Sequence, residues 1–258
     1  EKDYKISAGM AARRLEYTVL KNMNLFTTTW NVGNLSPFSS NVYPDLIKWL
    51  FSPNPEADPF DNTNYNNDLL GETELEIQLQ NSDLLVFALQ EIVNLENPLN
   101  LVMSTYISSN FQGWNDVLLK AINDYHSTFG GKRYTLLTST NLVGMAMYAF
   151  VPIDNDNIST STSNTSATTT NRRTEITYSS FSDIRILNYG CGFMSIGGNK
   201  GAVGISMTIY DSTLAFIGSH FASGDKDSDT VKRNKDYATI AAYGMFHGNA
   251  HSTSGTDT

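Results

Sequence analysis

The chain has 258 residues, a formal net charge of −9 at pH 7 and one cysteine, Cys191. This length suffices for one large domain or two small ones, and a hydrophobic content of 40% is typical of a globular protein rather than a disordered one. The negative charge disfavours nucleic acid as a partner, whereas a small anionic substrate is compatible with it if a cation or a local basic cluster neutralises that substrate. One cysteine excludes an intrachain disulfide and suggests a reducing compartment.

The ends of the chain give two further expectations. No apolar run approaches the ~18 residues that a membrane span requires, and the opening sequence EKDYKISAGM is not a signal peptide. Because the sequence lacks an initiator Met, we expect it to be cut from a longer one.

Hydrophobic spacing predicts a helix, a strand and a second helix in the first fifty residues. Residues 1–22 form a lead-in segment with a short helix, since apolar side chains recur there every four positions. Residues 24–32, NLFTTTWNV, are rich in Thr and aromatic residues, as strands are. Residues 43–51 suit a helix that has Pro44 near its first turn.

The remaining elements are predicted within a domain of residues 23–248, which two polar insertions interrupt. The insertions lie near 52–68 and 154–175, and residues 249–258 form a polar tail. The predicted helices are 110–126 and 228–246, and the predicted strands are 84–89, 134–139, 141–151, one near 184, 202–210 and 213–219. The last helix is expected to have Asp229 as its cap and to make apolar contacts through Tyr237, Ile240, Ala241 and Tyr243. Because neighbouring strands could form hairpins, the pattern favours an α/β sandwich over a doubly wound sheet.

Three of these strands are apolar along their length and polar at their C-terminal end. They end in Trp30-Asn31, Gln90-Glu91 and Ser219-His220. Ligand sites in α/β proteins gather where strand ends open into loops, so an amide, a carboxylate and an imidazole could converge there. Each residue considered alone also has a purely structural interpretation. Asn31 could serve to shape a turn, Glu91 could begin a solvated loop, and His220 could be hydrogen-bonded to the backbone.

A glycine-rich segment, GGNKGAVGI at 197–205, places Asn199 and Lys200 between glycines just before a strand. Glycines permit tight turns and the close approach of a bound group, and a lysine can meet a phosphate as a point charge. The alternative interpretation is a glycine-rich hairpin with an exposed lysine.

Six motifs occur in a defined order: TTTWNVGNLSP, LLVFALQEIVNL, NLVGMAM, GGNKGAVGISM, GSHFASG and RNKDYATI. Together they resemble the catalytic domain of the inositol polyphosphate 5-phosphatases, over about residues 13 to 246. The resemblance implies the fold of the endonuclease/exonuclease/phosphatase superfamily. That fold is a DNase I-like four-layer α/β sandwich, in which two mixed β-sheets are flanked by helices.

The resemblance also assigns metal and catalytic roles. Glu91 matches the glutamate that binds the essential Mg²⁺, and Asn31 matches the asparagine beside it in the site. His220 matches the histidine that contacts the reacting phosphate. Mg²⁺ prefers oxygen ligands and takes one or two carboxylates together with water and phosphate, so a glutamate at a strand end is a suitable anchor.

Further residues match binding and supporting positions of the family. Asn199 and Lys200 match the loop near the substrate. Gln90, Arg233 and Asn234 are expected to support the site structurally.

The activity that the resemblance implies is Mg²⁺-dependent hydrolysis of a 5-phosphate. The substrates would be phosphoinositide lipids such as phosphatidylinositol 4,5-bisphosphate, or soluble inositol polyphosphates. The enzyme would work in the cytoplasm, peripherally at membranes and without nucleic acid.

Downstream motifs of the family, of the types GDxNYR, W.DR and SDH, do not occur in this sequence. The chain is therefore expected to carry about the first half of the fold, with sheet faces and strand edges uncovered, and to be poorly stable or inactive alone. One alternative is a truncated, non-catalytic fragment that binds lipid or a partner. Another is a nuclease or sphingomyelinase of the same superfamily, which the charge and the GNKGAV and RNxDY motifs disfavour.

Overall fold

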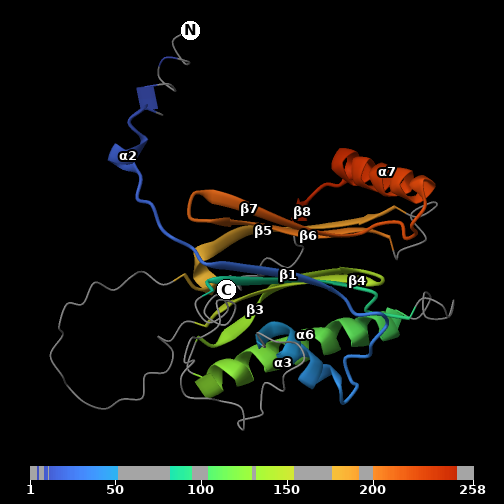
Figure 1. Ribbon diagram of the computed structural model, residues 1–258. Helices are drawn as coiled ribbons and strands as arrows, with labels where there is room; N and C mark the ends of the chain where they lie inside the picture. Colours follow the sequence, from blue (N-terminus) through green and yellow to red (C-terminus); the bar gives the residue numbers. More distant parts are fainter. Residues whose placement is uncertain are drawn as a thin grey trace, which may run out of the picture.

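The computed structural model describes residues 5, 9–10, 12–51, 82–94, 104–129, 132–153, 176–191 and 200–248. The predicted insertions and polar tail lie outside these residues. The described residues form four layers, with two stacked β-sheets between helices α3 and α6 on one side and helix α7 on the other (Figure 1). The predicted α/β sandwich is thus confirmed.

The first sheet is mixed and has the strand order β1-β2-β4-β3. Its strands are β1 (Leu25–Asn31), β2 (Leu84–Gln90), β3 (Tyr134–Leu142) and β4 (Met145–Pro152). β1 and β2 are parallel, whereas β4 is antiparallel to both β2 and β3. Helices α3 (Val42–Phe51) and α6 (Ser104–Phe129) cover one face of this sheet (Figure 1).

The second sheet has the order β7-β6-β5-β8, and each of its described pairings is antiparallel. Its strands are β5 (Phe181–Gly190), β6 (Gly201–Ile209), β7 (Ser212–His220) and β8 (His247–Gly248). A 3-10 turn, η2 (Tyr178–Ser180), precedes β5, and helix α7 (Asp227–Tyr243) lies over the outer face (Figure 1).

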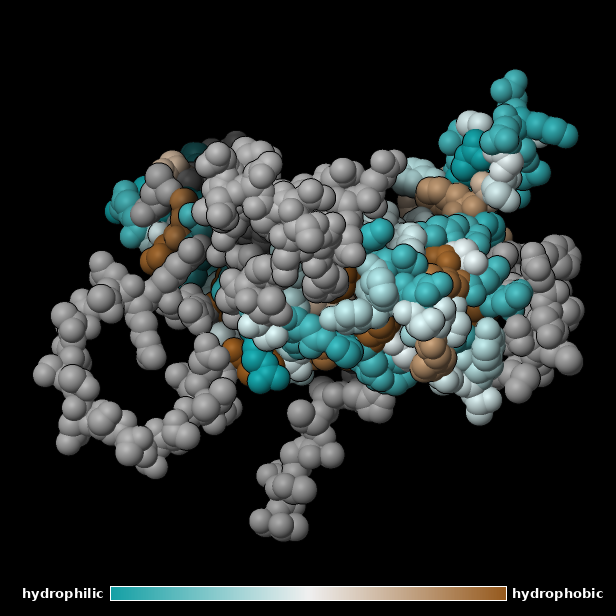
Figure 2. Space-filling model, turned by 60° about the horizontal axis from the view of Figure 1, so that its bottom comes forward, coloured by the Kyte–Doolittle hydropathy of each residue, from teal (hydrophilic) through white to brown (hydrophobic). Residues whose placement is uncertain are grey.

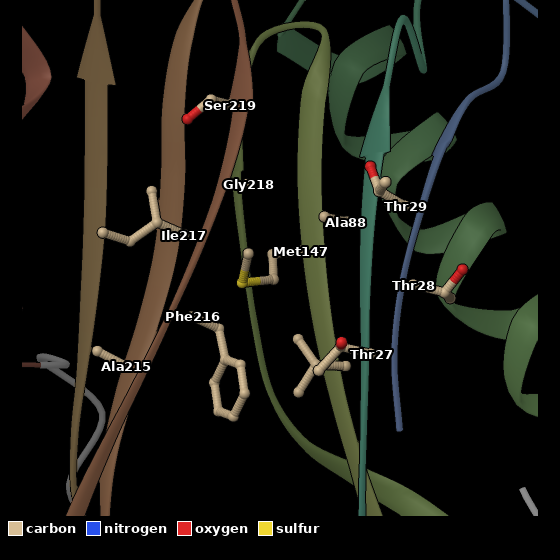
Figure 3. A pocket seen from close by; sticks show the side chains of 11 residues that line it. Thr27, Thr28, Thr29, Ala88, Met147, Ala215, Phe216, Ile217, Gly218 and Ser219 are labelled. Atoms are coloured by element: carbon tan, nitrogen blue, oxygen red, sulfur yellow. The ribbon is translucent and has the colours of Figure 1, made fainter. Parts of the chain in front are cut away.

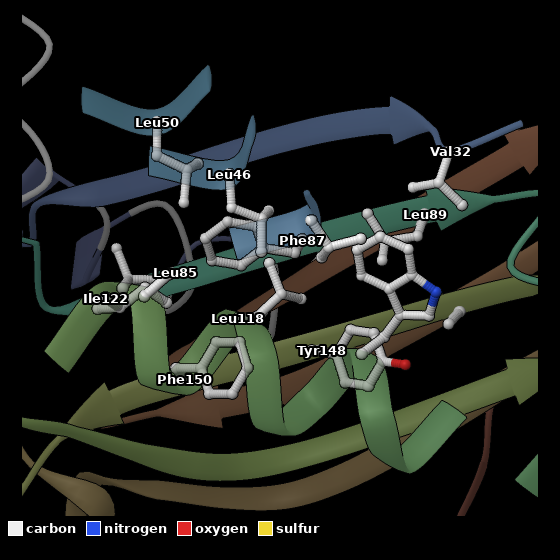
Figure 4. Close-up of a cluster of buried hydrophobic side chains, with 14 of the residues drawn as sticks. Val32, Leu46, Leu50, Leu85, Phe87, Leu89, Leu118, Ile122, Tyr148 and Phe150 are labelled. Atoms are coloured by element: carbon white, nitrogen blue, oxygen red, sulfur yellow. The ribbon is translucent and has the colours of Figure 1, made fainter. Parts of the chain in front are cut away.

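Strand β2 is buried along its whole length, as its apolar sequence predicts. Leu85, Phe87 and Leu89 pack against α3 and α6, together with Leu46, Leu50, Leu118 and Ile122 (Figure 4). The alternate residues Leu84, Val86 and Ala88 face the second sheet, where they meet Val203 and Ile205. A strand that is covered on both faces needs apolar residues at every position, which explains the unbroken run.

The N-terminal helix ends earlier than its spacing predicts. Residues 9–10 and 12 are helical, helix α2 covers Arg14–Tyr17, and the chain is extended at Thr18. Val19 and Leu20 are 85% and 72% exposed, so no core holds the apolar face of a longer helix. Short helices without such tertiary packing are marginal in water, which explains the early end.

Helix α7 packs through fewer residues than its sequence predicts. Of the apolar contacts expected from this segment, Ile240 is buried, whereas Tyr237 and Tyr243 are 66% and 65% exposed. Asp229 lies inside the helix rather than at its cap position, and its carboxylate accepts a 3.3 Å hydrogen bond from the Lys226 amide. Among the residues of α7, Ile240 is therefore the one buried apolar side chain that packs on the second sheet.

The surface on the side of α3 and α6 is mainly hydrophilic, with small apolar patches between the polar residues (Figure 2). Among the described helices, none combines the length and the apolar character that crossing a bilayer requires.

His126 on α6 predicts a pH dependence of stability. The ring is buried against Tyr134, with ring centroids 5.2 Å apart, and neither ring nitrogen has a hydrogen-bond partner in the described structure. Burial lowers the pKa of His126 from 6.5 to about 4, so the unfolded chain takes up a proton first. Stability should fall by roughly 1 kcal/mol per pH unit as pH drops from 6.5 to 4.

Urea unfolding of the chain and of His126→Phe, between pH 8 and pH 4.5, measures this effect. Phe keeps the ring but lacks the buried nitrogens, so the variant should be at least as stable at pH 8 and should lose this part of the pH dependence. Equal slopes for the two proteins would contradict the assignment to His126.

Candidate active site

The sheet topology brings the predicted strand ends to one edge of the sandwich. Because β1 and β2 are parallel and in register, Asn31 lies beside Gln90, and Glu91 follows directly. In the second sheet Gly201 is the register partner of His220, so Lys200 lies next to the end of β7. These two pairings place Asn31 beside the end of β2 in one sheet and Lys200 beside His220 in the other.

Close packing between the sheets brings the end of β7 toward the end of β2. Gly218 faces the first sheet, and a Cβ at this position would lie 2.8 Å from the Ala88 Cβ atom. Only a glycine permits this approach without a shift of the strands. Since His220 is two residues further along β7, its side chain points to the same face as Gly218.

Glu91 has an unusual backbone conformation that fixes where its carboxylate lies. Its φ angle is 56°, in the left-handed region that costs a non-glycine residue energy. The Glu91 carbonyl accepts a 2.9 Å hydrogen bond from the Asn34 amide, which ties the end of β2 to the turn after β1. The carboxylate is 33% exposed, and its Oε1 atom lies 3.6 Å from His220 Nε2. A metal ion could therefore reach it from solvent.

Lys200 and His220 form a close pair, with 2.7 Å between Lys200 Nζ and His220 Nε2. A charged lysine can only donate, so Nε2 accepts this hydrogen bond and the neutral imidazole carries its proton on Nδ1. Burial lowers the pKa of Lys200, while the carboxylates of Glu91 and Asp236 oppose that shift. The site thus combines a carboxylate, an imidazole and an amine at one edge.

Asn31 and Gln90 also shape the backbone of the site. The Asn31 side-chain oxygen accepts a 3.0 Å hydrogen bond from the Gly33 amide, so Asn31 does shape the turn. Its second lone pair can still take a metal ion. Gln90 Nε2 donates to Thr29 Oγ1 at 2.9 Å, which links β2 to β1, while its supporting role toward the site stays a prediction.

The donor set suits a hydrated Mg²⁺ rather than a fully protein-ligated metal. In the described part of the chain, no group of three or more His, Cys, Asp or Glu side chains is placed to hold a metal ion. Mg²⁺ keeps several waters and commonly takes only one or two carboxylates. Glu91 as the anchor, with Asn31 at the end of the neighbouring strand, fits that preference.

The loop after β7 is held by α7. Arg233 Nη1 donates to the carbonyl of Gly224 at 2.8 Å and to that of Ala222 at 3.4 Å. Asn234 is exposed, so its predicted supporting role stays a prediction. The predicted binding residue Asn199 lies outside the described residues.

Asp236 is a residue that the sequence argument missed. Its carboxylate accepts a 2.9 Å hydrogen bond from the Ala222 amide, two residues after His220. Its position in the RNKDY motif could have indicated this role, because it lies three residues after Arg233 and therefore on the same helix face.

A groove of about 500 Å³ runs between the end strands β1 and β7 (Figure 3). Its described lining residues are uncharged and include Thr27, Thr29, Phe216 and Ser219. Thr29 and Ser219 lie close to the strand ends that carry Asn31 and His220. β1 and β7 are the outermost strands of their sheets among the described residues, so the groove lies between two strand edges.

The Lys200–His220 contact predicts a single imidazole tautomer, which nitrogen NMR of the His220 ring can measure above pH 8. The chain should show the proton on Nδ1. Lys200→Met removes the donor to Nε2 and should produce a mixture of tautomers, whereas Lys48→Met on α3 should leave the ring signals unchanged. Identical His220 signals in the chain and in Lys200→Met would contradict the contact.

Sequence comparisons identify the family and several relatives of the chain. Residues 28–257 match the family model of the endonuclease/exonuclease/phosphatase family 2. Human synaptojanin-2 is 29% identical over 238 residues, which are 92% of this chain and 13% of that protein. A type I inositol polyphosphate 5-phosphatase 8 from Arabidopsis thaliana is 25% identical over 85% of this chain and 41% of its own length. The chain thus spans less than half of either relative.

A solved structure shares the fold. It is the inositol polyphosphate 5-phosphatase domain of SPsynaptojanin, in complex with inositol (1,4)-bisphosphate and a calcium ion. The TM-score is 0.59 at 23% identity, over 95% of this chain and 53% of that chain. The predicted DNase I-like sandwich and the resemblance to a 5-phosphatase domain are confirmed, and the chain belongs to the endonuclease/exonuclease/phosphatase family 2.

Proposed function

We propose that the chain is part of an inositol polyphosphate 5-phosphatase catalytic domain, with a site for Mg²⁺-dependent hydrolysis of a 5-phosphate. The substrates are phosphoinositides such as phosphatidylinositol 4,5-bisphosphate, or the corresponding soluble inositol polyphosphates. The observation that carries the proposal is the meeting of Glu91, Lys200 and His220, with His220 Nε2 placed 2.7 Å from Lys200 Nζ and 3.6 Å from Glu91 Oε1.

Each of these residues has a chemical role toward a bound phosphate. A Mg²⁺ ion would neutralise phosphate charge and lower the pKa of a bound water. Glu91 would hold that ion, with Asn31 as a second oxygen donor. Lys200 supplies positive charge next to the phosphate, and its hydrogen bond orients the His220 ring.

The ligand of the related structure supports a 5-phosphate as the group removed. Inositol (1,4)-bisphosphate is the compound that remains when inositol 1,4,5-trisphosphate loses its 5-phosphate. The synaptojanin domain holds it together with calcium. Calcium and magnesium are both hard cations that take oxygen ligands, so a site of this type can serve Mg²⁺ here.

The net charge of the chain affects how strongly it would bind to a membrane. A net charge of −9 opposes general attraction to anionic lipids. Peripheral membrane binding would therefore depend on the metal-assisted contact with a phosphorylated headgroup. We place this activity in the cytoplasm, in line with the single cysteine.

Turnover by this chain alone is expected to be slow or absent. The family's downstream motifs, which supply the water-activating aspartate and further substrate contacts, do not occur in the sequence. Mg²⁺-dependent binding is therefore a more direct readout of the site than phosphate release.

Sedimentation of the chain with phosphatidylcholine vesicles tests the proposal. The vesicles carry phosphatidylinositol 4,5-bisphosphate or, as a control, phosphatidylinositol 4-phosphate, in Mg²⁺ or in a chelator, and phosphate release is measured in the same samples. We expect Mg²⁺-dependent retention that is stronger on the bisphosphate. Retention that survives both the chelator and Glu91→Gln would favour a non-catalytic lipid-binding fragment instead, and Mg²⁺-dependent cleavage of DNA would favour a nuclease.

A further inference from the structure

The loop that leaves β7 is held from both sides by one face of α7. Arg233 donates to the carbonyls of Ala222 and Gly224, and Asp236 accepts from the Ala222 amide at 2.9 Å. The two side chains are three residues apart and so share a helix face. We call Arg233 and Asp236 the α7 clamp. It fixes both polar groups of the Ala222 residue, two positions after His220.

Asp236 also lies beside the strand end that carries Lys200. The Cys191 amide donates to the Lys200 carbonyl at 2.9 Å, and the Cys191 thiol contacts the Asp236 carbonyl at 3.8 Å. The negative charge of Asp236 favours the protonated form of Lys200 and so raises its pKa against the effect of burial. One residue of α7 is thus connected to both partners of the Lys200–His220 pair.

These polar contacts matter because α7 has little apolar attachment. Only Asp229 and Ile240 of this helix are buried. Ile240 belongs to a small cluster with Leu187 and Ala202, on the outer face of the second sheet. Because α7 has one buried apolar residue, apolar packing does not fix the rotation of the helix about its axis. Polar contacts therefore set that rotation and the path of the loop after β7.

We infer that Asp236 is a positioning residue, which fixes the Ala222 amide and thereby holds the His220 ring against Lys200. The inference rests on the proposed function only for its effect on phosphate binding, because the geometry of the Lys200–His220 pair can be observed without any ligand.

The test compares Asp236→Ala and Asp236→Asn with the chain itself. Ala removes the acceptor, whereas Asn keeps an oxygen that can accept from the Ala222 amide. Asp227→Ala is the control, since Asp227 is an exposed carboxylate on the same helix and changes the net charge equally. Two quantities are measured by NMR: the hydrogen-exchange rate of the Ala222 amide, and the tautomer of the His220 ring above pH 8.

Asp236→Ala should raise the exchange rate of the Ala222 amide by about tenfold or more, since hydrogen bonds to charged acceptors are the stronger class. It should also convert the single Nδ1–H tautomer of His220 into a mixture. Asp236→Asn should keep both properties close to those of the chain, and Asp227→Ala should change neither. If Asp236→Ala does not fold, Asp236→Ser replaces it in the comparison. The serine side chain is polar but too short to accept a hydrogen bond from the Ala222 amide.

Three outcomes would overturn the inference. In the first, folded Asp236→Ala keeps the single His220 tautomer. In the second, Asp227→Ala changes the Ala222 exchange rate and the His220 tautomer as much as Asp236→Ala does. In the third, Asp236→Asn loses the single tautomer although its Ala222 amide stays protected. If the chain binds inositol 1,4,5-trisphosphate in Mg²⁺, Asp236→Ala should also weaken that affinity about tenfold. A chain that binds no inositol phosphate would defeat the proposed function, while the two NMR readouts would still decide the role of Asp236.

Discussion

Glu91→Gln is expected to reduce the affinity of the chain for Mg²⁺ by about 100-fold or more. Gln has nearly the same shape but lacks the negative charge that a hard cation requires. Glu91 is the carboxylate at the site, and its Oε1 atom lies 3.6 Å from His220 Nε2. The measurement is Mn²⁺ binding by electron paramagnetic resonance, with displacement by Mg²⁺.

Glu16→Gln provides the matched control for this experiment. Glu16 is an exposed glutamate on α2 that pairs with Arg13, far along the chain from the strand ends. It should bind Mn²⁺ as the chain does. Equal Mn²⁺ affinity in the chain and in Glu91→Gln would contradict the assignment of Glu91 as the metal anchor.

Gly218→Ala should lower the free energy of unfolding by about 1–3 kcal/mol, and Gly218→Val by more. The added Cβ would lie 2.8 Å from Ala88 Cβ and 3.2 Å from Met147 Cε, so β7 must move away from β2. That movement would also separate His220 from Glu91. Urea unfolding measures the first effect, and Mg²⁺-dependent inositol phosphate binding measures the second.

The control for Gly218 is Gly248→Ala in β8, where a Cβ would meet no atom within 4 Å. This variant should change the unfolding free energy by less than about 0.5 kcal/mol. A Gly218→Ala protein as stable as Gly248→Ala would mean that the sheets are not packed tightly at this point.

The element types were predictable because hydrophobic patterning decides them. The unbroken apolar run of β2 predicted burial on both faces, and the polar strand ends predicted that Asn31, Glu91 and His220 would converge. The Lys200–His220 contact was also predictable from the sequence, because the two-residue turn between β6 and β7 fixes Gly201 opposite His220.

Other features depend on tertiary contacts that no local pattern encodes. In the first sheet β4 lies between β2 and β3. Which strands pair with one another depends on the tertiary fold and not on the local sequence of each strand. The role of Asp236 depends on the path of the loop at Ala222, which the helix sequence alone does not reveal.

The most direct test of a metal-dependent 5-phosphate site is phosphorus NMR of inositol 1,4,5-trisphosphate, which resolves its three phosphates. The ligand is mixed with the chain or with Glu91→Gln, with and without Mg²⁺. In Mg²⁺ and the chain, the 5-phosphate signal should change most, either by a shift on binding or by replacement with inorganic phosphate. Equal changes at all three phosphates, or the same change with Glu91→Gln, would contradict the proposed site.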